Sequence, residues 1–153
     1  MYVTDELILE NCRIGRGAYR NFAGEKGPYN AQGKRTCVLI LDADLGAKLK
    51  EQGWGPIKFR EPRNEDDDPV ALFTVECRFD KKPPVIKLHT KNGTTILDET
   101  NVAILDTADI ERCDLVLSPY NWDVNGSTGT KGFIKEMHVT LHETNYFGGR
   151  YDE

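Results

Sequence analysis

The stretch VALFTVECRFD, residues Val70–Asp80, is the clearest strand signal in the chain and the starting point for its fold. Its apolar residues recur at every second position, which is the side-chain period of a β-strand. The set expected to face the core consists of Ala71, Phe73, Val75, Cys77 and Phe79. The stretch therefore predicts a long strand with one face packed on the core of a β-rich domain.

Further short strands are expected on both sides of this one. Runs of β-branched and apolar residues bounded by glycine, proline or asparagine are typical of strands. Such runs occupy residues 37–42, 56–60, 83–90, 113–122 and 132–143. The pair Asn92-Gly93 indicates a β-hairpin. The stretch VNGSTG, residues 124–129, is interpreted as a flexible connection.

Helical segments are expected to be few and short. Residues 42–53, DADLGAKLKEQG, predict a helix that is capped by Asp42 or Asp44 and ends at Gly53. Residues 98–110 are expected to form a short helix or turn, and the acidic stretch 61–69 a surface loop. The fold class is therefore mainly β: a single OB-like (Greek-key) barrel of about five or more strands with one or two short helices. A β-sandwich stays open as the alternative.

Composition indicates one folded, soluble domain. The chain has 153 residues, of which 39% are hydrophobic and 29% charged. We expect a β-barrel over residues 1–146 and a short flexible C-terminal tail over 147–153. The four cysteines show no CxxC spacing and no signal peptide is evident, which predicts a reduced, intracellular protein without disulfides. No apolar run approaches the roughly 20 residues that span a bilayer.

Positive charge is concentrated in one region of this acidic chain. The net charge is −5, yet residues 13–35 hold six basic residues against the single acid Glu25. The last part of this region is the irregular stretch RNFAGEKGPYNAQGKR, Arg20–Arg35. A local basic stripe can steer a polyanion to one surface even when the whole protein is acidic. The alternative is a solvated loop without a ligand.

Aromatic residues accompany this charge. Sequence-independent binding of a single strand requires cations for the phosphates and flat side chains on which bases stack. The basic loop contains Phe22 and Tyr29, the stretch 53–60 contains Trp54 and Lys58, and the stretch 118–122 contains Tyr120 and Trp122 and leads on to Lys131. Each ring taken singly is more often a core residue. Their shared setting of glycine and positive charge favours nucleic-acid binding.

Catalytic and metal-binding patterns are weak by comparison. The chain has no GxSxG, P-loop, GxGxxG or HExxH motif. His138 and His142 lie on one face of a predicted strand about 13 Å apart, too far for a shared metal, and His89 has no evident partner. The carboxylate pairs Asp42/Asp44 and Asp106/Asp109 could hold Mg²⁺ in a nuclease, but both occur where turn and capping acids are expected. We expect no enzyme activity, no metal and no cofactor, with a nuclease as the minor alternative.

The segments 20–42, 53–61 and 114–141 carry motifs in a distinctive order and spacing. Together they resemble a family of single-stranded DNA-binding proteins encoded by tailed bacteriophages, and the similarity spans about Arg20 to Tyr146. The matching positions are Arg20, Asn21, Phe22, Gly24, Lys34, Arg35, Gly53, Trp54, Pro119, Tyr120, Asn121 and Trp122, with Lys131 and Phe133 near the family's lysine–aromatic pair. Cys37 departs from the larger apolar residue expected there. Because only Asp152 and Glu153 stand at the C-terminus, recruitment of partners through an acidic tail is not expected.

The resemblance implies an OB fold and a protein that coats single-stranded DNA without sequence specificity during replication or recombination, in the cytoplasm of the infected bacterial host. Replication or recombination proteins and self-association on DNA are its further candidate partners. The residues expected to neutralise phosphates are Arg20, Lys26, Lys34, Arg35, Lys58 and Lys131, and those expected to stack on bases are Phe22, Tyr29, Trp54, Tyr120 and Trp122. Tyr29 is the weakest of these, since it could only pin the turn. The rival is a non-enzymatic protein-interaction or virion-associated β-domain, in which Trp54 and Trp122 would anchor a protein interface.

Overall fold

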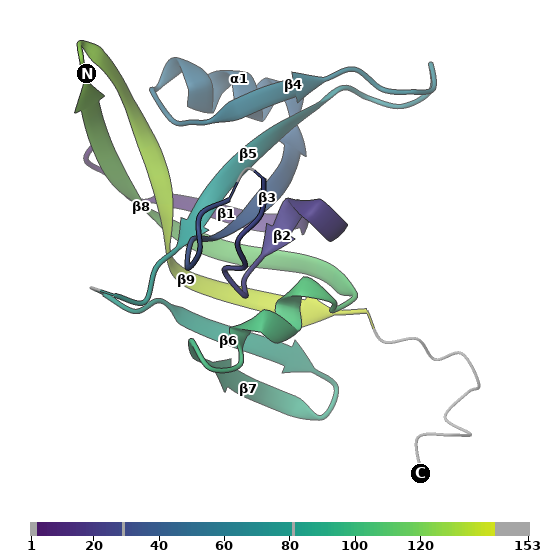
Figure 1. Cartoon of the computed structure of the whole chain (residues 1–153). Helices are drawn as coiled ribbons and strands as arrows, with labels where there is room; N and C mark the ends of the chain where they lie inside the picture. Colours follow the sequence, from purple (N-terminus) through teal and green to yellow (C-terminus); the bar gives the residue numbers. More distant parts are fainter. Residues whose placement is uncertain (1–2, 29, 81, 143–153) are drawn as a thin grey trace.

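The computed structural model describes residues 3–28, 30–80 and 82–142 (Figure 1). Tyr29 and the expected tail 147–153 lie outside the described residues. In chain order the elements are β1 (Leu7–Ile14), the 3-10 turn η1 (Gly17–Tyr19), β2 (Arg20–Asn21), β3 (Arg35–Asp42), α1 (Ala43–Glu51), β4 (Ile57–Arg60), β5 (Val70–Cys77), β6 (Val85–Thr90), β7 (Gly93–Leu97), the 3-10 turn η2 (Val102–Asp106), β8 (Ile110–Val124) and β9 (Ser127–Leu141). In this described part, no helix has the length and apolar character needed to cross a membrane.

Five strands form a ring. The strands β5, β3, β1, β8 and β9 are hydrogen-bonded in that order, each antiparallel to the next, and a parallel pairing of β5 with β9 joins the two ends. This closure consists of one residue pair, Glu76 with Phe133. Strand β4 extends the ring beside β5, and the hairpin β6–β7 extends it beside β9. The mainly-β, OB-like barrel is confirmed, and the sandwich alternative falls because one continuous sheet curls on itself.

The interior of the ring follows the predicted alternation. Ala71, Phe73, Val75 and Cys77 of β5 are buried, whereas Phe79 lies beyond the end of the strand and is half-buried. The neighbouring strand β3 contributes Cys37, Leu39 and Leu41 to the same core. Cys37, the departure from the family pattern, is therefore a small core residue. The outward positions of β5, among them Glu76, remain available to line a surface.

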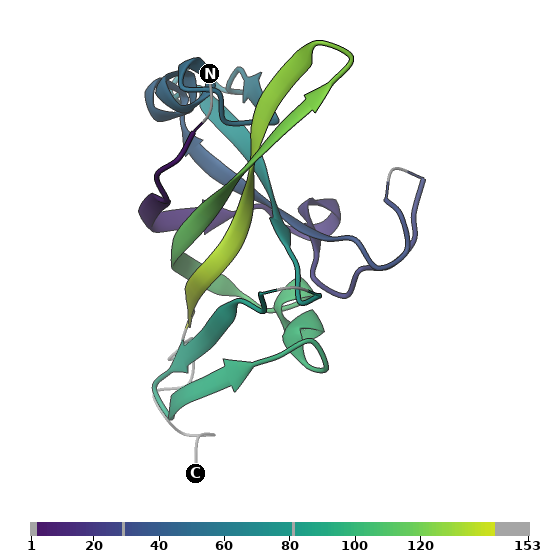
Figure 2. The ribbon, with the colours of Figure 1, turned by 90° about the vertical axis from the view of Figure 1, so that its left-hand side faces the viewer.

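The strand β1 and the tight turn between β8 and β9 differ from the sequence interpretation. Strand β1 was not predicted, because a bulge with Asn11 at φ 55° interrupts its alternation. The expected flexible connection 124–129 is a two-residue turn: Asn125 and Gly126 have φ of 52° and 85°, and both flanking segments are strand. Positive φ at both central residues suits the twist of a hairpin. Figure 2 shows the resulting β8–β9 hairpin standing away from the barrel.

The helix α1 packs directly on β5 through a glycine. Asp42 is the N-cap residue as predicted, although its side chain makes no capping hydrogen bond. A Cβ on Gly46 would lie 2.2 Å from the Cβ of Ala71. Only a residue without a side chain allows the helix to approach the strand this closely.

We expect Gly46→Ala to lower the free energy of unfolding by about 1–3 kcal/mol, because overpacking at this contact outweighs the better helix propensity of alanine. The matched control is Gly27→Ala, since a Cβ there meets nothing within 4 Å. Chemical denaturation of both variants measures the effect. A Gly46→Ala protein as stable as the wild type would contradict the close packing of α1 on β5.

Candidate nucleic-acid interface

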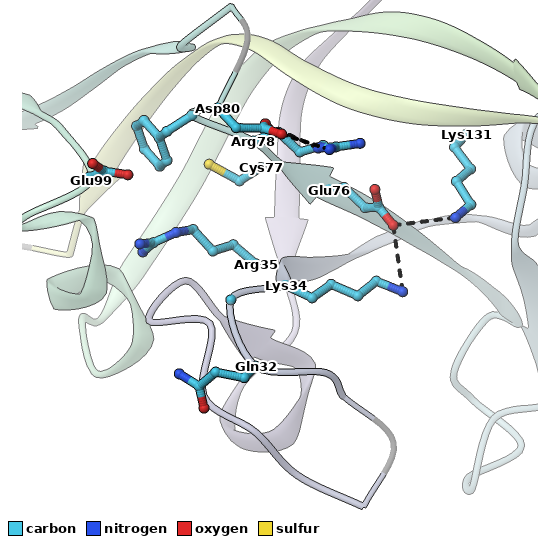
Figure 3. Close-up of a pocket in the computed structure, with 11 residues that line it drawn as sticks. Gln32, Lys34, Arg35, Glu76, Cys77, Arg78, Asp80, Glu99 and Lys131 are labelled. Carbon is cyan, nitrogen blue, oxygen red and sulfur yellow. Dashed lines mark hydrogen bonds and ion pairs between the residues drawn. The ribbon is translucent and has the colours of Figure 1, made fainter.

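A cleft of about 620 Å³ lies where the turn before β3, the end of β5 and the β8–β9 hairpin meet (Figure 3). Its lining comes from four separate parts of the sequence. It comprises Gln32, Gly33, Lys34, Arg35, Glu76, Cys77, Arg78, Phe79, Asp80, Glu99 and Lys131. Three of the predicted phosphate-binding residues are therefore brought together here: Lys34, Arg35 and Lys131.

Glu76 lies at the centre of the charge in this cleft. Its Oε1 is 3.6 Å from the Nζ of Lys34 and 3.5 Å from the Nζ of Lys131. Figure 3 shows both lysines directed toward this carboxylate from two sides. Their side chains are 47% and 39% exposed, whereas that of Glu76 is 14% exposed. The lysines thus cover the acid and present their ammonium groups to solvent.

Arg35 is held more tightly than the two lysines. Its Nη1 donates a 2.6 Å hydrogen bond to the carbonyl oxygen of Phe22, and its guanidinium lies 5.4 Å from the ring centroid of Phe79. Figure 3 shows the side chain directed away from Glu76. Arg35 therefore contributes positive charge to another part of the cleft while it ties the basic loop to β3.

An exposed aromatic stack adjoins the cleft. The rings of Tyr120 and Phe133 are parallel to within 16°, with centroids 5.0 Å apart, and the guanidinium of Arg78 lies 5.3 Å from the centroid of Phe133. Asp80 accepts two hydrogen bonds from Arg78, of 2.8 and 3.3 Å. These bonds, with further help from the charge of Glu76, raise the pKa of the Arg78 guanidinium. Cation and rings thus form one layered surface.

A second hollow of about 540 Å³ continues from this stack. It shares Arg78 and Asp80 with the first cleft and is bounded on one side by Tyr120 and Phe133. Apolar atoms of Pro83, Val85 and Ile134 form part of its lining. The two hollows are therefore neighbours across Arg78.

The β8–β9 register explains why the aromatic residues share a face. Tyr120 is paired with Lys131 and Trp122 with Gly129, so these four positions project to one side of the hairpin. A Cβ on Gly129 would lie 2.7 Å from Cζ2 of Trp122, which shows that the half-buried indole lies across the glycine. The strand thus covers part of the Trp122 ring, whereas Tyr120 is 48% exposed.

The structure corrects the assignment of Arg20 to phosphate binding. This residue is only 6% exposed. Its guanidinium donates hydrogen bonds to the carbonyl oxygens of Gly15, Leu105 and Ala108 at 2.7, 3.1 and 2.6 Å. Burial, followed by the charge of Arg16, lowers its pKa from the ordinary value. Arg20 therefore fastens the basic loop to η2 and does not face a ligand.

Phe22 and Trp54 are likewise core residues rather than stacking surfaces. Phe22 has no exposed area and Trp54 is 3% exposed. The Trp54 ring packs edge-on against Phe73, with centroids 6.2 Å apart. The glycines on both sides of Trp54 have no side chains that could cover its ring, but other residues of the barrel do cover it. Neither ring has a free face for a base.

Lys26 and Lys58 are exposed but do not line the cleft. Lys26 lies in the basic loop, and Lys58 lies on β4 beside Leu72 of β5. The structure therefore does not bring either lysine into the cleft with Lys34, Arg35 and Lys131. Sequence reasoning left Glu76 and Arg78 out of the site, although both alternate with the core-facing residues of the predicted strand Val70–Asp80. It also did not count Phe133 as a stacking residue.

The candidate catalytic acids and the histidines have other contacts. Asp106 accepts hydrogen bonds from the backbone N–H groups of Phe22 and Ala23, at 2.6 and 3.0 Å, and Asp109 forms an exposed ion pair with Arg16. His89 does have a partner, since its Nε2 lies 2.9 Å from Nδ1 of His138. No cluster of three or more His, Cys, Asp or Glu suited to a metal occurs within residues 3–28, 30–80 and 82–142.

The four cysteines are buried free thiols. Burial is the main cause that raises the pKa of Cys12 to about 11 and that of Cys77 to about 12. Thiols with such raised pKa values are protonated at neutral pH and are poor nucleophiles.

Comparison with known proteins gives a family and a fold. The model of the putative phage ssDNA-binding domain matches residues 1–152. The single-stranded DNA-binding protein from bacteriophage Enc34 has a similar structure, with 10% identity, a TM-score of 0.55, and coverage of 96% of this chain and 87% of that one. Its complex with ssDNA gives 10% identity, a TM-score of 0.54, and coverage of 92% and 89%. At this identity the likeness shows the fold. No curated protein sequence matches the chain.

We expect Arg20→Gln to destabilise the protein by roughly 3 kcal/mol, because buried carbonyl groups lose their charged donor. Arg16→Gln, in the same loop but in an exposed ion pair, should change stability by less than about 1 kcal/mol. Urea denaturation separates the two. Equal stability of both variants would show that Arg20 does not fasten the loop.

Proposed function

The chain belongs to the family of putative phage ssDNA-binding domains, and from this membership we propose that it coats single-stranded DNA of a bacteriophage without sequence specificity, during replication or recombination. Its place of action is then the cytoplasm of the infected bacterial cell. The family is of a DNA-binding type, and we propose that this chain binds the strand without cleaving it.

One observation carries the proposal: lysines from two distant segments converge beside an exposed aromatic stack. Lys34 and Lys131 meet at Glu76, and Tyr120 stands opposite Lys131 in the hairpin. Ammonium groups neutralise phosphates and a flat ring accepts a base, so the arrangement offers both contacts that a single strand requires.

The proposed strand path runs from the basic turn across the end of β5 to the hairpin. Phosphates would lie at Lys34, Arg35 and Lys131, and a base would stack on the exposed face of Tyr120. Phe133 supports that ring from behind. Stacking accepts any base, which agrees with binding that is indifferent to sequence.

The proposed site differs in part from the sequence-based set. Arg78 and Phe133 join it, while Arg20, Phe22 and Trp54 leave it because they are buried. Lys26, Lys58 and Trp122 remain flanking candidates at the margin of the path. Tyr29 stays a prediction, since it lies outside the described residues.

Titration with oligo-dT tests the function directly. We expect tryptophan fluorescence to be quenched and the affinity to fall as salt is raised. Absence of binding at low salt would overturn the proposal and leave the protein-interaction alternative. A labelled strand incubated with Mg²⁺ or Mn²⁺ should remain intact, and its cleavage would refute binding without catalysis.

We expect Tyr120→Ala to weaken oligo-dT binding by about 5- to 100-fold, because one stacking contact contributes roughly 1–3 kcal/mol. Phe59→Ala is the matched control: Phe59 has the same 48% exposure but lies on β4 beside Lys50 of α1. Fluorescence anisotropy measures both affinities. Equal losses in the two variants would place the strand elsewhere.

We expect Lys34→Gln and Lys131→Gln each to reduce the slope of log affinity against log salt by about 0.7, the value for one phosphate contact on a single strand. Lys48→Gln, on the exposed face of α1, serves as the control for a general charge effect. The measurement is a set of oligo-dT titrations at several salt concentrations. Unchanged slopes in both cleft variants would remove these lysines from the path.

A further inference from the structure

A carboxylate stands in the middle of the proposed phosphate cleft. Glu76 there opposes the binding of any anion, because it cancels one of the two positive charges of Lys34 and Lys131. The acid requires an explanation that the proposed function alone does not supply.

Structural support does not account for this acid. Both ion pairs are substantially exposed on the lysine side, and such pairs add little to stability. The ring closure at Glu76 uses its backbone, through the pairing with Phe133. A neutral side chain of the same shape would therefore be compatible with the fold.

The geometry of the contact resembles an anion site that is already filled. Both ammonium groups approach the same oxygen, Oε1, at 3.6 and 3.5 Å. A phosphate oxygen makes the same kind of charge-assisted contact with lysine. The carboxylate is also the less exposed partner, at 14%, so the lysines are held over it and are not spread through solvent.

We propose that Glu76 occupies the place of a DNA phosphate in the free protein, and that strand binding exchanges the carboxylate for a phosphate between Lys34 and Lys131. This inference rests on the proposed single-strand function and names the residue that sets the electrostatic strength of the site. The free protein already orients the two lysines toward one anion, while the need to displace the carboxylate lowers the affinity for phosphate alone.

The exchange has a consequence for selectivity. A polyanion without bases must displace Glu76 by charge alone, whereas a single strand adds the stacking contact at Tyr120. The local charge of Lys34, Lys131 and Glu76 together is one positive unit, and it becomes two when the acid is neutralised. Once displaced, the carboxylate of Glu76 binds a cation from solution. Strand binding to the wild type should therefore release about one cation fewer, in total, than strand binding to a protein without this acid.

The test compares Glu76→Gln with the wild type in oligo-dT titrations at several salt concentrations. We expect the variant to bind about tenfold more tightly at 50 mM salt and its salt slope to be steeper by about 0.7. Glu65→Gln makes the same change in net charge in the exposed loop 61–69 and should alter the affinity by less than about twofold. In the Lys131→Gln background, Glu76→Gln should increase the affinity by a smaller factor, because one of the two lysines that would bind the phosphate is absent.

Several outcomes would overturn the exchange. Weaker binding by Glu76→Gln would show that the carboxylate positions the lysines, and an unchanged slope would show that it does not compete with phosphate. Inorganic polyphosphate, a phosphate chain without bases, is the second probe. If neither protein binds oligo-dT, the proposed function fails. In that case, tighter binding of polyphosphate by Glu76→Gln than by the wild type would still support the exchange, and equal binding by the two proteins would refute it.

Discussion

The parallel pairing of β5 with β9 is the constraint on which the candidate interface depends. It joins the ends of the five-strand ring through Glu76 and Phe133. Each of these residues also organises one half of the surface, since Glu76 gathers the two lysines and Phe133 supports Tyr120 and Arg78. The barrel therefore closes at the place where the charged and aromatic parts of the site meet.

A reciprocal set of buried and half-buried hydrogen bonds holds the basic loop against the barrel. Arg20 donates to carbonyl groups around η2, and Asp106 at the end of η2 accepts the backbone N–H groups of Phe22 and Ala23. Buried polar groups require such partners, and their loss is expensive. The first motif of the family resemblance thus serves to place the loop, and Lys34 and Arg35 at its end line the cleft.

The acidic character of the protein and its proposed ligand are compatible because charge acts locally. A net charge of −5 describes the whole chain, whereas the cleft collects cations from the turn before β3, the start of β3, the residue after β5, and β9. At physiological salt, charges separated by more than about 8 Å are largely screened from each other. An incoming strand close to the cleft then meets the cations Lys34, Arg35, Arg78 and Lys131 together with the acids Glu76, Asp80 and Glu99. Among these acids, Glu76 is the one that lies between Lys34 and Lys131.

Local pattern in the sequence determined the class of the fold. The alternation of residues 70–77, the helix after Asp42 and the hairpin at Asn92-Gly93 were predictable, since each depends on neighbours along the chain. Strand β1 escaped prediction, because its bulge breaks the period of two.

Which rings are exposed was decided by the tertiary structure alone. Phe22 and Trp54 resemble Tyr120 in their glycine-rich, basic settings, but burial depends on what strands from elsewhere place over a ring. The contact of Lys34 and Lys131 with Glu76 could likewise not be predicted from the sequence, because only closure of the barrel brings these segments together.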